Sequence, residues 1–227
     1  MHVDDDMTPG DNSTVADRVA SVRQRIADAG GKNVELIAVT KTFDVSAMVS
    51  AFDSGCDGVG ENYAQELIAK AKLLPIEKRL PVHFIGRLQT NKIKALIEVV
   101  DIWQSVDRPE LIKEIAKRSA TAKSQAKIML QVNSTNEMDK GGCQPAEVEE
   151  LLRLAIESKI SVIGLMTVGP TQNEPELTRQ GFRLVRKLAD DLGLAQCSMG
   201  MTGDLEIAVS EGATMIRVGS ALFGARS

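Results

Sequence analysis

A lysine follows an apolar, β-branched segment near the start of the chain, and its amine is the first candidate for chemistry. Residues 35–42 read ELIAVTKT, so Lys41 stands near the end of a run typical of a buried strand. A desolvated lysine amine has a lowered pKa and readily attacks a carbonyl group. A charged residue at a strand end more often only reaches solvent. A Schiff base at Lys41 is therefore a hypothesis that needs support from elsewhere in the chain.

Glycine and hydroxyl residues near the C-terminus form a second candidate group. Residues 198–204 read SMGMTGD, and residues 217–220 read RVGS. Glycine lets the backbone approach a ligand, hydroxyl groups donate hydrogen bonds, and amides that open a helix favour an anion. Such a pair is also common in ordinary turns. Together with Lys41, it suggests a ligand with a carbonyl at one end and a phosphate at the other, a description that pyridoxal 5′-phosphate (PLP) meets.

Short apolar strands that alternate with helices must position these residues. Strands are predicted over 35–42, 57–60, 82–86, 102–106, 126–133, 161–166, 195–199 and 214–218, and helices over 13–29, 45–54, 63–74, 90–99, 109–122, 145–158, 175–192 and 203–210. Eight such units favour a single-domain (β/α)₈ TIM barrel, typically about 250 residues long, with an extra N-terminal helix. An open doubly wound sheet is the alternative.

In a barrel, the C-terminal ends of the strands lie on one face, and ligands bind there. The predicted strand ends carry mostly polar residues, namely Lys41, Glu61, Asn62, Gly86, Arg87, Asp107, Arg108, Asn133, Met166, Thr167, Ser198, Gly200, Arg217, Gly219 and Ser220. Turns also require polar residues. The pattern therefore supports a pocket at this face without proving one.

Composition excludes several classes of protein. The 227 residues carry a net charge of −4 and a pI of about 5.4, with five Phe, one Trp and one Tyr, so a nucleic-acid partner is not expected. Three cysteines and two histidines offer neither a disulfide framework nor a metal site, and favour a reducing cytoplasm. Neither a signal peptide nor a membrane span is recognisable. Residues 1–12 are predicted to be a disordered acidic tail, and residues 13–227 the barrel domain.

Ordered motifs over almost the whole chain resemble those of the pyridoxal phosphate homeostasis protein family. They are AVTKT at 38–42, VGENYAQE at 59–66, HFIGRLQTNK at 83–92, QSVDR at 104–108, VNSTNEMDKGG at 132–142, GLMTVGP at 164–170, SMGMTGD at 198–204 and IRVGSALFGAR at 216–226. The resemblance implies a PLP-binding TIM barrel related to the N-terminal domain of alanine racemase, with the cofactor on the first-strand lysine.

The resemblance also implies roles for particular residues. Lys41 would form the Schiff base, Arg217 would face the pyridine nitrogen, and Asn62 would lie beside the cofactor. The phosphate would be held by Ser198 and by the backbone of Gly219 and Ser220. Met199 and Gly200, which follow Ser198 in the chain, complete the predicted cofactor-binding set. Thr202 replaces the usual serine after SMGM, and Ser220 stands where threonine is frequent; both keep the hydroxyl.

Arg217 bears on whether the protein is an enzyme. An arginine can only donate to the pyridine nitrogen, so it leaves the ring a weaker electron sink than a carboxylate would. Related racemases also need a tyrosine from a further domain and a partner subunit, whereas the one tyrosine here is Tyr63. We therefore expect no catalytic residue and no turnover, but a cytoplasmic monomer that carries PLP for vitamin B6 homeostasis. It would make at most transient contact with apo PLP-dependent enzymes.

Two other functions stay open on the sequence, an amino-acid racemase or decarboxylase that uses PLP and a Schiff-base aldolase. Several further residues have a structural and a functional interpretation. His83 could be a base but fits a structural histidine better. Lys92 and Lys140 could attract anions, although solvated loop lysines are the safer interpretation, and Cys197 is expected to be buried.

Overall fold

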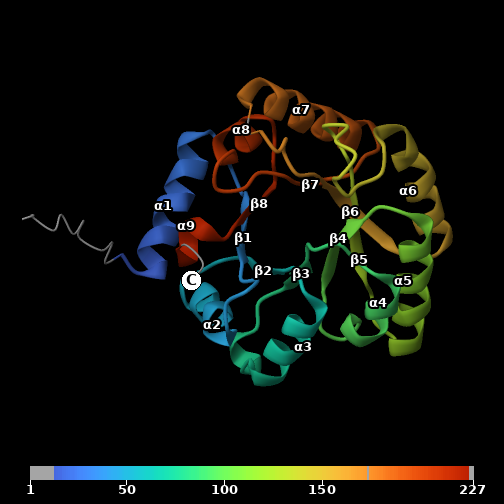
Figure 1. Ribbon diagram of the computed structural model, residues 1–227, viewed down its shortest axis with the longest axis horizontal. Helices are drawn as coiled ribbons and strands as arrows, with labels where there is room; N and C mark the ends of the chain where they lie inside the picture. The colour runs from blue at the N-terminus through green and yellow to red at the C-terminus, as the bar shows by residue number, and fades with distance from the viewer. Residues whose placement is uncertain (1–12, 173, 225–227) are drawn as a thin grey trace, which may run out of the picture.

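Eight parallel strands close into a barrel in this computed structural model, which describes residues 13–172 and 174–224. The strands follow one another around the ring in sequence order, and β8 pairs with β1 (Figure 1). They are β1 (Glu35–Val39), β2 (Gly58–Glu61), β3 (Val82–Phe84), β4 (Ile102–Val106), β5 (Lys127–Gln131), β6 (Ser161–Met166), β7 (Gln196–Ser198) and β8 (Met215–Val218). The predicted (β/α)₈ barrel is confirmed, and the open sheet is wrong. The tail predicted over residues 1–12 lies outside the described residues.

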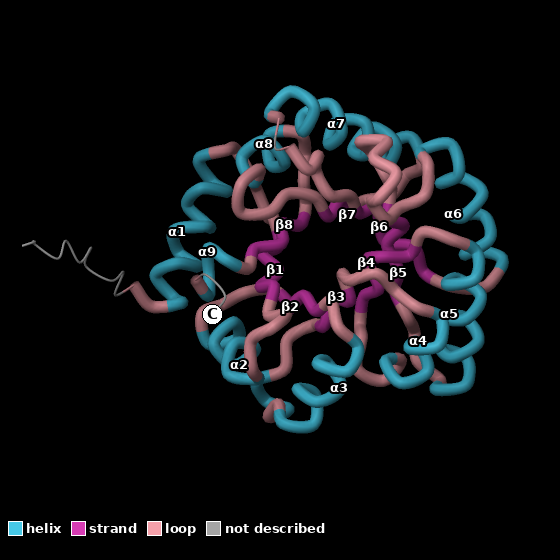
Figure 2. The backbone as a smooth tube through the Cα atoms, in the orientation of Figure 1, coloured by secondary structure: helices cyan, strands magenta, loops and turns pink. Residues whose placement is uncertain are grey.

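Helices surround the ring of strands on all sides (Figure 2). They are α1 (Val15–Asp28), α2 (Val45–Asp53), α3 (Ala64–Leu73), α4 (Thr90–Leu96), α5 (Pro109–Ala122), α6 (Val148–Glu157), α7 (Pro175–Asp191), α8 (Leu205–Ser210) and α9 (Ser220–Phe223), with 3₁₀ turns η1 (Ile76–Lys78) and η2 (Pro145–Glu147). The extra helix α1 is confirmed and lies beside α8 and α9 (Figure 1). The short α9, which directly follows β8, was not predicted.

Sequence periodicity accounts for how α1 packs. Val19, Val22 and Ile26 recur at helical spacing, and all three are buried against the barrel. Thr14 caps the helix, because its hydroxyl accepts a hydrogen bond from the Asp17 amide and the Asp17 carboxylate accepts one from the Thr14 amide.

The core has two layers, which differ in polarity. The larger one fills the space between strands and helices with aliphatic and aromatic side chains. The smaller one lies inside the barrel and combines Ile37, Met129, Met166 and Met215 with polar side chains from β3, β4, β7 and β8. A β-strand points alternate side chains to opposite faces, so each strand supplies both layers.

The first strand is shorter than the apolar run that predicts it. It ends at Val39, and residues 40–43 form a turn in which the Phe43 amide donates to the Thr40 carbonyl at 3.2 Å. Thr42 has a φ of 69°, which no extended strand allows. Lys41 therefore lies on a turn beyond the strand, still on the face at which the C-terminal ends of the strands meet.

Two further observations concern the described residues as a whole. Over 13–172 and 174–224, no helix combines the length and the apolar character needed to cross a membrane. Across the same ranges, His, Cys, Asp and Glu side chains do not gather in threes as a metal ion would need.

Candidate functional site

The turn that carries Lys41 packs against the start of α9. A Cβ atom at Gly219 would lie 3.2 Å from the carbonyl oxygen of Val39, so glycine at this position favours the close approach of the two backbone segments. The rings of Phe43 and Phe223 are in contact, with centroids 5.3 Å apart. These contacts pack the turn that contains Lys41 against the segment that opens α9.

The mouth of the barrel is the opening at the C-terminal ends of its strands, and two hydroxyl groups from neighbouring segments meet there. Thr202 Oγ1 and Ser220 Oγ lie 3.4 Å apart, and Thr202 is anchored because Arg25 of α1 donates to its carbonyl at 3.0 Å. Arg25 is itself held by an ion pair with Glu206 at 2.6 Å. Hydroxyls beside the first amides of a helix, which have no partner within the helix, suit an anion such as phosphate. Thr202 was absent from the predicted set, although its hydroxyl in SMGMT was a signal for it.

Gly200 shapes the loop that leads to Thr202. Its φ of 94° is one that glycine adopts readily, and a Cβ there would come 2.5 Å from Cβ of Ala208. Its carbonyl accepts a hydrogen bond from the Arg217 amide at 3.0 Å. Gly200 therefore ties the loop after β7 to strand β8.

A chain of hydrogen bonds runs through the barrel interior from Arg217 to His83. Arg217 Nη1 donates to Ser198 Oγ at 2.6 Å, and Ser198 Oγ donates to Gln104 Oε1 at 2.7 Å. Gln104 Nε2 lies 2.7 Å from His83 Nδ1 and 3.0 Å from the sulfur of Met215. Since an amide nitrogen can only donate, His83 accepts at Nδ1 and carries its proton on Nε2.

This chain corrects the role predicted for Ser198. Its hydroxyl was expected to bind phosphate, but it points into the barrel, where its hydrogen and an oxygen lone pair are used by Gln104 and Arg217. Ser198 is the last residue of β7, and strand alternation directs its side chain inward. The hydroxyls that face each other at the mouth belong to Thr202 and Ser220 instead.

The same alternation corrects the prediction for Met199. Its side chain is fully buried in the layer between strands and helices, on the opposite face of the chain from Ser198. It does not line the mouth. Met166 lies inside the barrel, and Met201 is a methionine of this loop with an exposed side chain, at 40%. Cys197 is buried, as predicted, and burial raises the pKa of its thiol to about 11.

The guanidinium of Arg217 is buried, and hydrogen bonds to two protein oxygens fix its orientation. Besides Ser198, its Nη2 atom donates to the Thr167 carbonyl at 2.8 Å. Burial lowers the pKa of Arg217 to about 10, and the carboxylate of Asp204 acts in the opposite direction. The guanidinium therefore keeps its charge at neutral pH and can only donate hydrogen bonds.

Asn62, the residue after β2, has a buried side-chain oxygen that is able to accept a hydrogen bond. Its Oδ1 atom is buried and has no hydrogen-bond partner among residues 13–172 and 174–224. Gly86 lets the loop after β3 pass close by, because a Cβ there would lie 2.2 Å from the Asn62 carbonyl oxygen. A buried polar atom without a partner is rare and indicates a ligand or a bound water. The Asn62 oxygen could bind a polar ring substituent, and the cradle formed by Thr202, Gly219 and Ser220 could bind a phosphate, so these residues fit a cofactor that carries both groups.

His83 has the structural role that the sequence favoured. It is 1% exposed, and burial lowers its pKa to about 4. A Cβ at Gly58 would lie 2.9 Å from its Nε2 atom, so glycine makes the room for the imidazole. A neutral histidine that is enclosed and hydrogen-bonded to Gln104 supports the polar core of the barrel.

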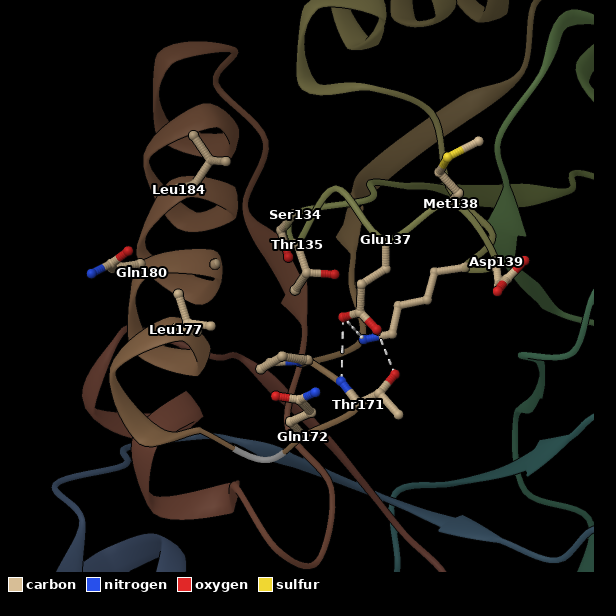
Figure 3. A pocket seen from close by; sticks show the side chains of 13 residues that line it. Ser134, Thr135, Glu137, Met138, Asp139, Thr171, Gln172, Leu177, Gln180 and Leu184 are labelled. Carbon is tan, nitrogen blue, oxygen red and sulfur yellow. Dashed lines mark hydrogen bonds and ion pairs between the residues drawn. The ribbon is translucent and has the colours of Figure 1, made fainter.

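A separate hollow of about 950 Å³ lies between α7 and the loops after β5 and β6 (Figure 3). Glu137 crosses it, and its Oε2 accepts a hydrogen bond from the hydroxyl of Thr171 at 2.5 Å. Lys140 donates to Glu137 at 2.7 Å and to the Gly169 carbonyl, so it links two loops and is not the solvated lysine expected.

Lys92 lines a smaller hollow with Asn62 and Tyr63, and Tyr63 is 53% exposed.

The fold and this mouth define a barrel of the alanine racemase type. The family model described as "Alanine racemase, N-terminal domain" matches residues 11–227. An alanine racemase from Streptomyces coelicolor has the same fold at 18% identity, with a TM-score of 0.75, over 93% of this chain and 58% of that chain.

More similar proteins narrow the assignment. A pyridoxal phosphate homeostasis protein of Aquifex aeolicus is 37% identical over 221 residues, which span 94% of this chain and 96% of the relative. The structure of PipY from Synechococcus elongatus with PLP bound is 34% identical, with a TM-score of 0.79, over 93% of this chain and 100% of that chain. The chain belongs to the pyridoxal phosphate homeostasis protein family. A second relative with the name pyridoxal phosphate homeostasis protein, from Pseudomonas aeruginosa, is 36% identical over 94% of this chain and 96% of the relative.

Proposed function

We propose that this protein carries PLP as a Schiff base on Lys41 and takes part in intracellular PLP homeostasis without turning over a substrate. The packing of the Lys41 turn on the segment that opens α9 is the observation that supports the proposal, because a lysine on that turn would lie near a proposed phosphate cradle. When the cofactor is bound, the nitrogen of Lys41 joins the aldehyde carbon, a C=N bond forms and water leaves. Hydrolysis reverses this step and releases the cofactor.

The residues at the mouth have distinct proposed tasks. The hydroxyls of Thr202 and Ser220 and the amides from Gly219 onward would hold the phosphate, and Gly200 would shape that cradle. Arg217 would donate to the pyridine nitrogen and keep it unprotonated. Asn62 would bond a polar group of the ring through its unpartnered Oδ1.

Ser198 would act on the cofactor only through Arg217, whose guanidinium it orients. Met199 would contribute to packing beneath the cradle, since its side chain is buried away from the mouth. These two assignments replace the direct contacts that were expected from the motif.

Arg217 also supports carriage over catalysis. A donor at the pyridine nitrogen leaves the ring a weak electron sink, which disfavours the carbanion chemistry of racemases and decarboxylases. We propose that the protein is a monomer with PLP as its ligand and apo PLP-dependent enzymes as transient recipients. Light scattering of the loaded protein tests the monomer.

A spectroscopic titration tests the proposal. Adding PLP to the cofactor-free protein should produce a visible absorbance band that Lys41→Ala abolishes and the control Lys92→Ala retains. Incubation of the loaded protein with a panel of amino acids should leave their configuration and amount unchanged; racemisation or decarboxylation would favour the enzyme alternative. Mixing with a cofactor-free PLP enzyme should activate that enzyme faster than PLP is released into buffer. A colourless wild type would overturn the proposed function.

A further inference from the structure

Three charged side chains from the β2–α3 segment gather against the turn that holds Lys41. Glu61 ends β2 and is 0% exposed, and Lys70 on α3 is 4% exposed. Lys70 Nζ donates to Glu61 Oε1 at 2.7 Å and also contacts the carboxylate of Glu66, one helical turn earlier. Buried charges are costly unless they are paired and fully hydrogen-bonded. A buried cluster of this kind therefore calls for a reason at its position.

The cluster binds the peptide unit that precedes Lys41. Lys70 Nζ donates to the carbonyl oxygen of Thr40 at 2.8 Å, and the hydroxyl of Thr40 donates to Glu61 Oε1 at 2.7 Å. Thr40 is completely buried. Its carbonyl plane, which is also the peptide plane of the Lys41 nitrogen, is therefore held by a charged donor and cannot rotate freely.

The cluster also binds the peptide unit that follows Lys41. The amide of Thr42 donates to Glu66 Oε1 at 2.7 Å. Thr42 has a φ of 69°, a left-handed conformation that is strained for a β-branched residue. It occupies the third position of the turn closed by the Phe43 amide, where type II turns favour glycine. The bond to Glu66 offsets the cost of a conformation that threonine would otherwise avoid.

We propose that Glu61, Lys70 and Glu66 are positioning residues that clamp both peptide units around Lys41 and so aim its amine into the mouth. The φ and ψ angles of Lys41 lie between two fixed planes, and these angles set the direction of its Cα–Cβ bond. The inference rests on the proposed function of Lys41. None of the three residues is assigned a contact with the cofactor, so the clamp acts on the covalent step through Lys41 alone.

Glu66→Ala is the decisive variant, because it removes the acceptor of the Thr42 amide on a partly exposed helix face. The rate at which PLP forms the visible band should fall about ten- to hundredfold, as expected when a reacting group is misplaced by about 1 Å. The dissociation constant for pyridoxine 5′-phosphate, which has the phosphate and ring but no aldehyde, should change less than about twofold.

A glycine at position 42 distinguishes a loss of positioning at Lys41 from a general loss of stability, because it should restore the rate only in the first case. Gly readily adopts a positive φ, so Thr42→Gly in the Glu66→Ala background should restore most of the lost rate. Lys70→Met should slow the same step. Lys187→Met makes the same substitution at an exposed ion pair with Asp191 on α7, far from the turn in sequence, and serves as the control.

Three results would overturn the clamp. They are an unchanged rate in Glu66→Ala, a parallel loss of pyridoxine 5′-phosphate affinity, and failure of glycine at position 42 to restore the rate. Failure of the proposed function would look different, because the wild type itself would then form no band. If Lys70→Met does not fold, the Glu66 and Thr42 variants still decide the question.

Discussion

Ser198→Ala tests the internal hydrogen-bond chain against the alternative that Ser198 binds phosphate. The hydroxyl donates to Gln104 Oε1 at 2.7 Å and accepts from the Arg217 guanidinium at 2.6 Å, all in the buried interior. A hydrogen bond to a charged group contributes about 1.5–3 kcal/mol and one between neutral groups about 0.5–1.5 kcal/mol. The cofactor-free variant should therefore lose about 2–4 kcal/mol of unfolding free energy.

Thr202→Val is the matched variant, because it removes a hydroxyl of the mouth and keeps the shape of the side chain. Among residues 13–172 and 174–224, the Thr202 hydroxyl has Ser220 Oγ as its one hydrogen-bond partner, at 3.4 Å, so the unfolding free energy should change by less than about 0.5 kcal/mol. If the hydroxyl holds phosphate, the affinity for PLP should fall about ten- to hundredfold, as expected for a hydrogen bond to a charged group.

Urea unfolding of the two cofactor-free variants, followed by circular dichroism, gives the stabilities, and an absorbance titration gives the affinities. The two variants should separate, with Ser198→Ala losing mainly stability and Thr202→Val mainly affinity. The reasoning is refuted if Ser198→Ala keeps its stability and binds PLP as poorly as expected for Thr202→Val. That result would return Ser198 to the phosphate.

Two further predictions concern the packing beneath the mouth. Burial lowers the pKa of His83 from 6.5 to about 4. As the pH falls across that range, the unfolded chain binds a proton at this histidine and the folded chain does not, so the unfolding free energy of the wild type should drop by about 3 kcal/mol. In urea unfolding, the His83→Asn variant should lack this pH-dependent drop. Gly86→Ala places a Cβ 2.2 Å from the Asn62 carbonyl oxygen and should cost about 3 kcal/mol in thermal unfolding, whereas Gly203→Ala meets no atom within 4 Å and should be nearly neutral.

The barrel could be predicted because each strand is a short apolar run and each helix shows a clear periodicity. The residue at which the first strand ends could not be predicted, because nothing in the sequence marks Thr40 as the point where the chain turns. In that turn, the Thr42 amide donates to the carboxylate of Glu66 on α3. A contact between residues so far apart in sequence leaves no local signal at Thr42.

The side chains of the mouth show the same limit. The segment SMGMTGD predicts an anion cradle, but the choice between Ser198 and Thr202 depends on where β7 ends and which face each residue takes. Gln104 and His83 interrupt apolar strands, which was a signal for a polar barrel interior. Their connection through Ser198 to Arg217 follows only from the register that brings β3, β4, β7 and β8 around one axis.

The attachment point of the cofactor is the central claim, and one chemical measurement addresses it directly. The protein is loaded with PLP, reduced with borohydride so that any C=N bond becomes permanent, digested and mapped by mass spectrometry. A single pyridoxyl group on the peptide that contains Lys41 is the predicted result. A modification confined to another lysine, such as Lys92 or Lys140, or no modification at all, would contradict the account.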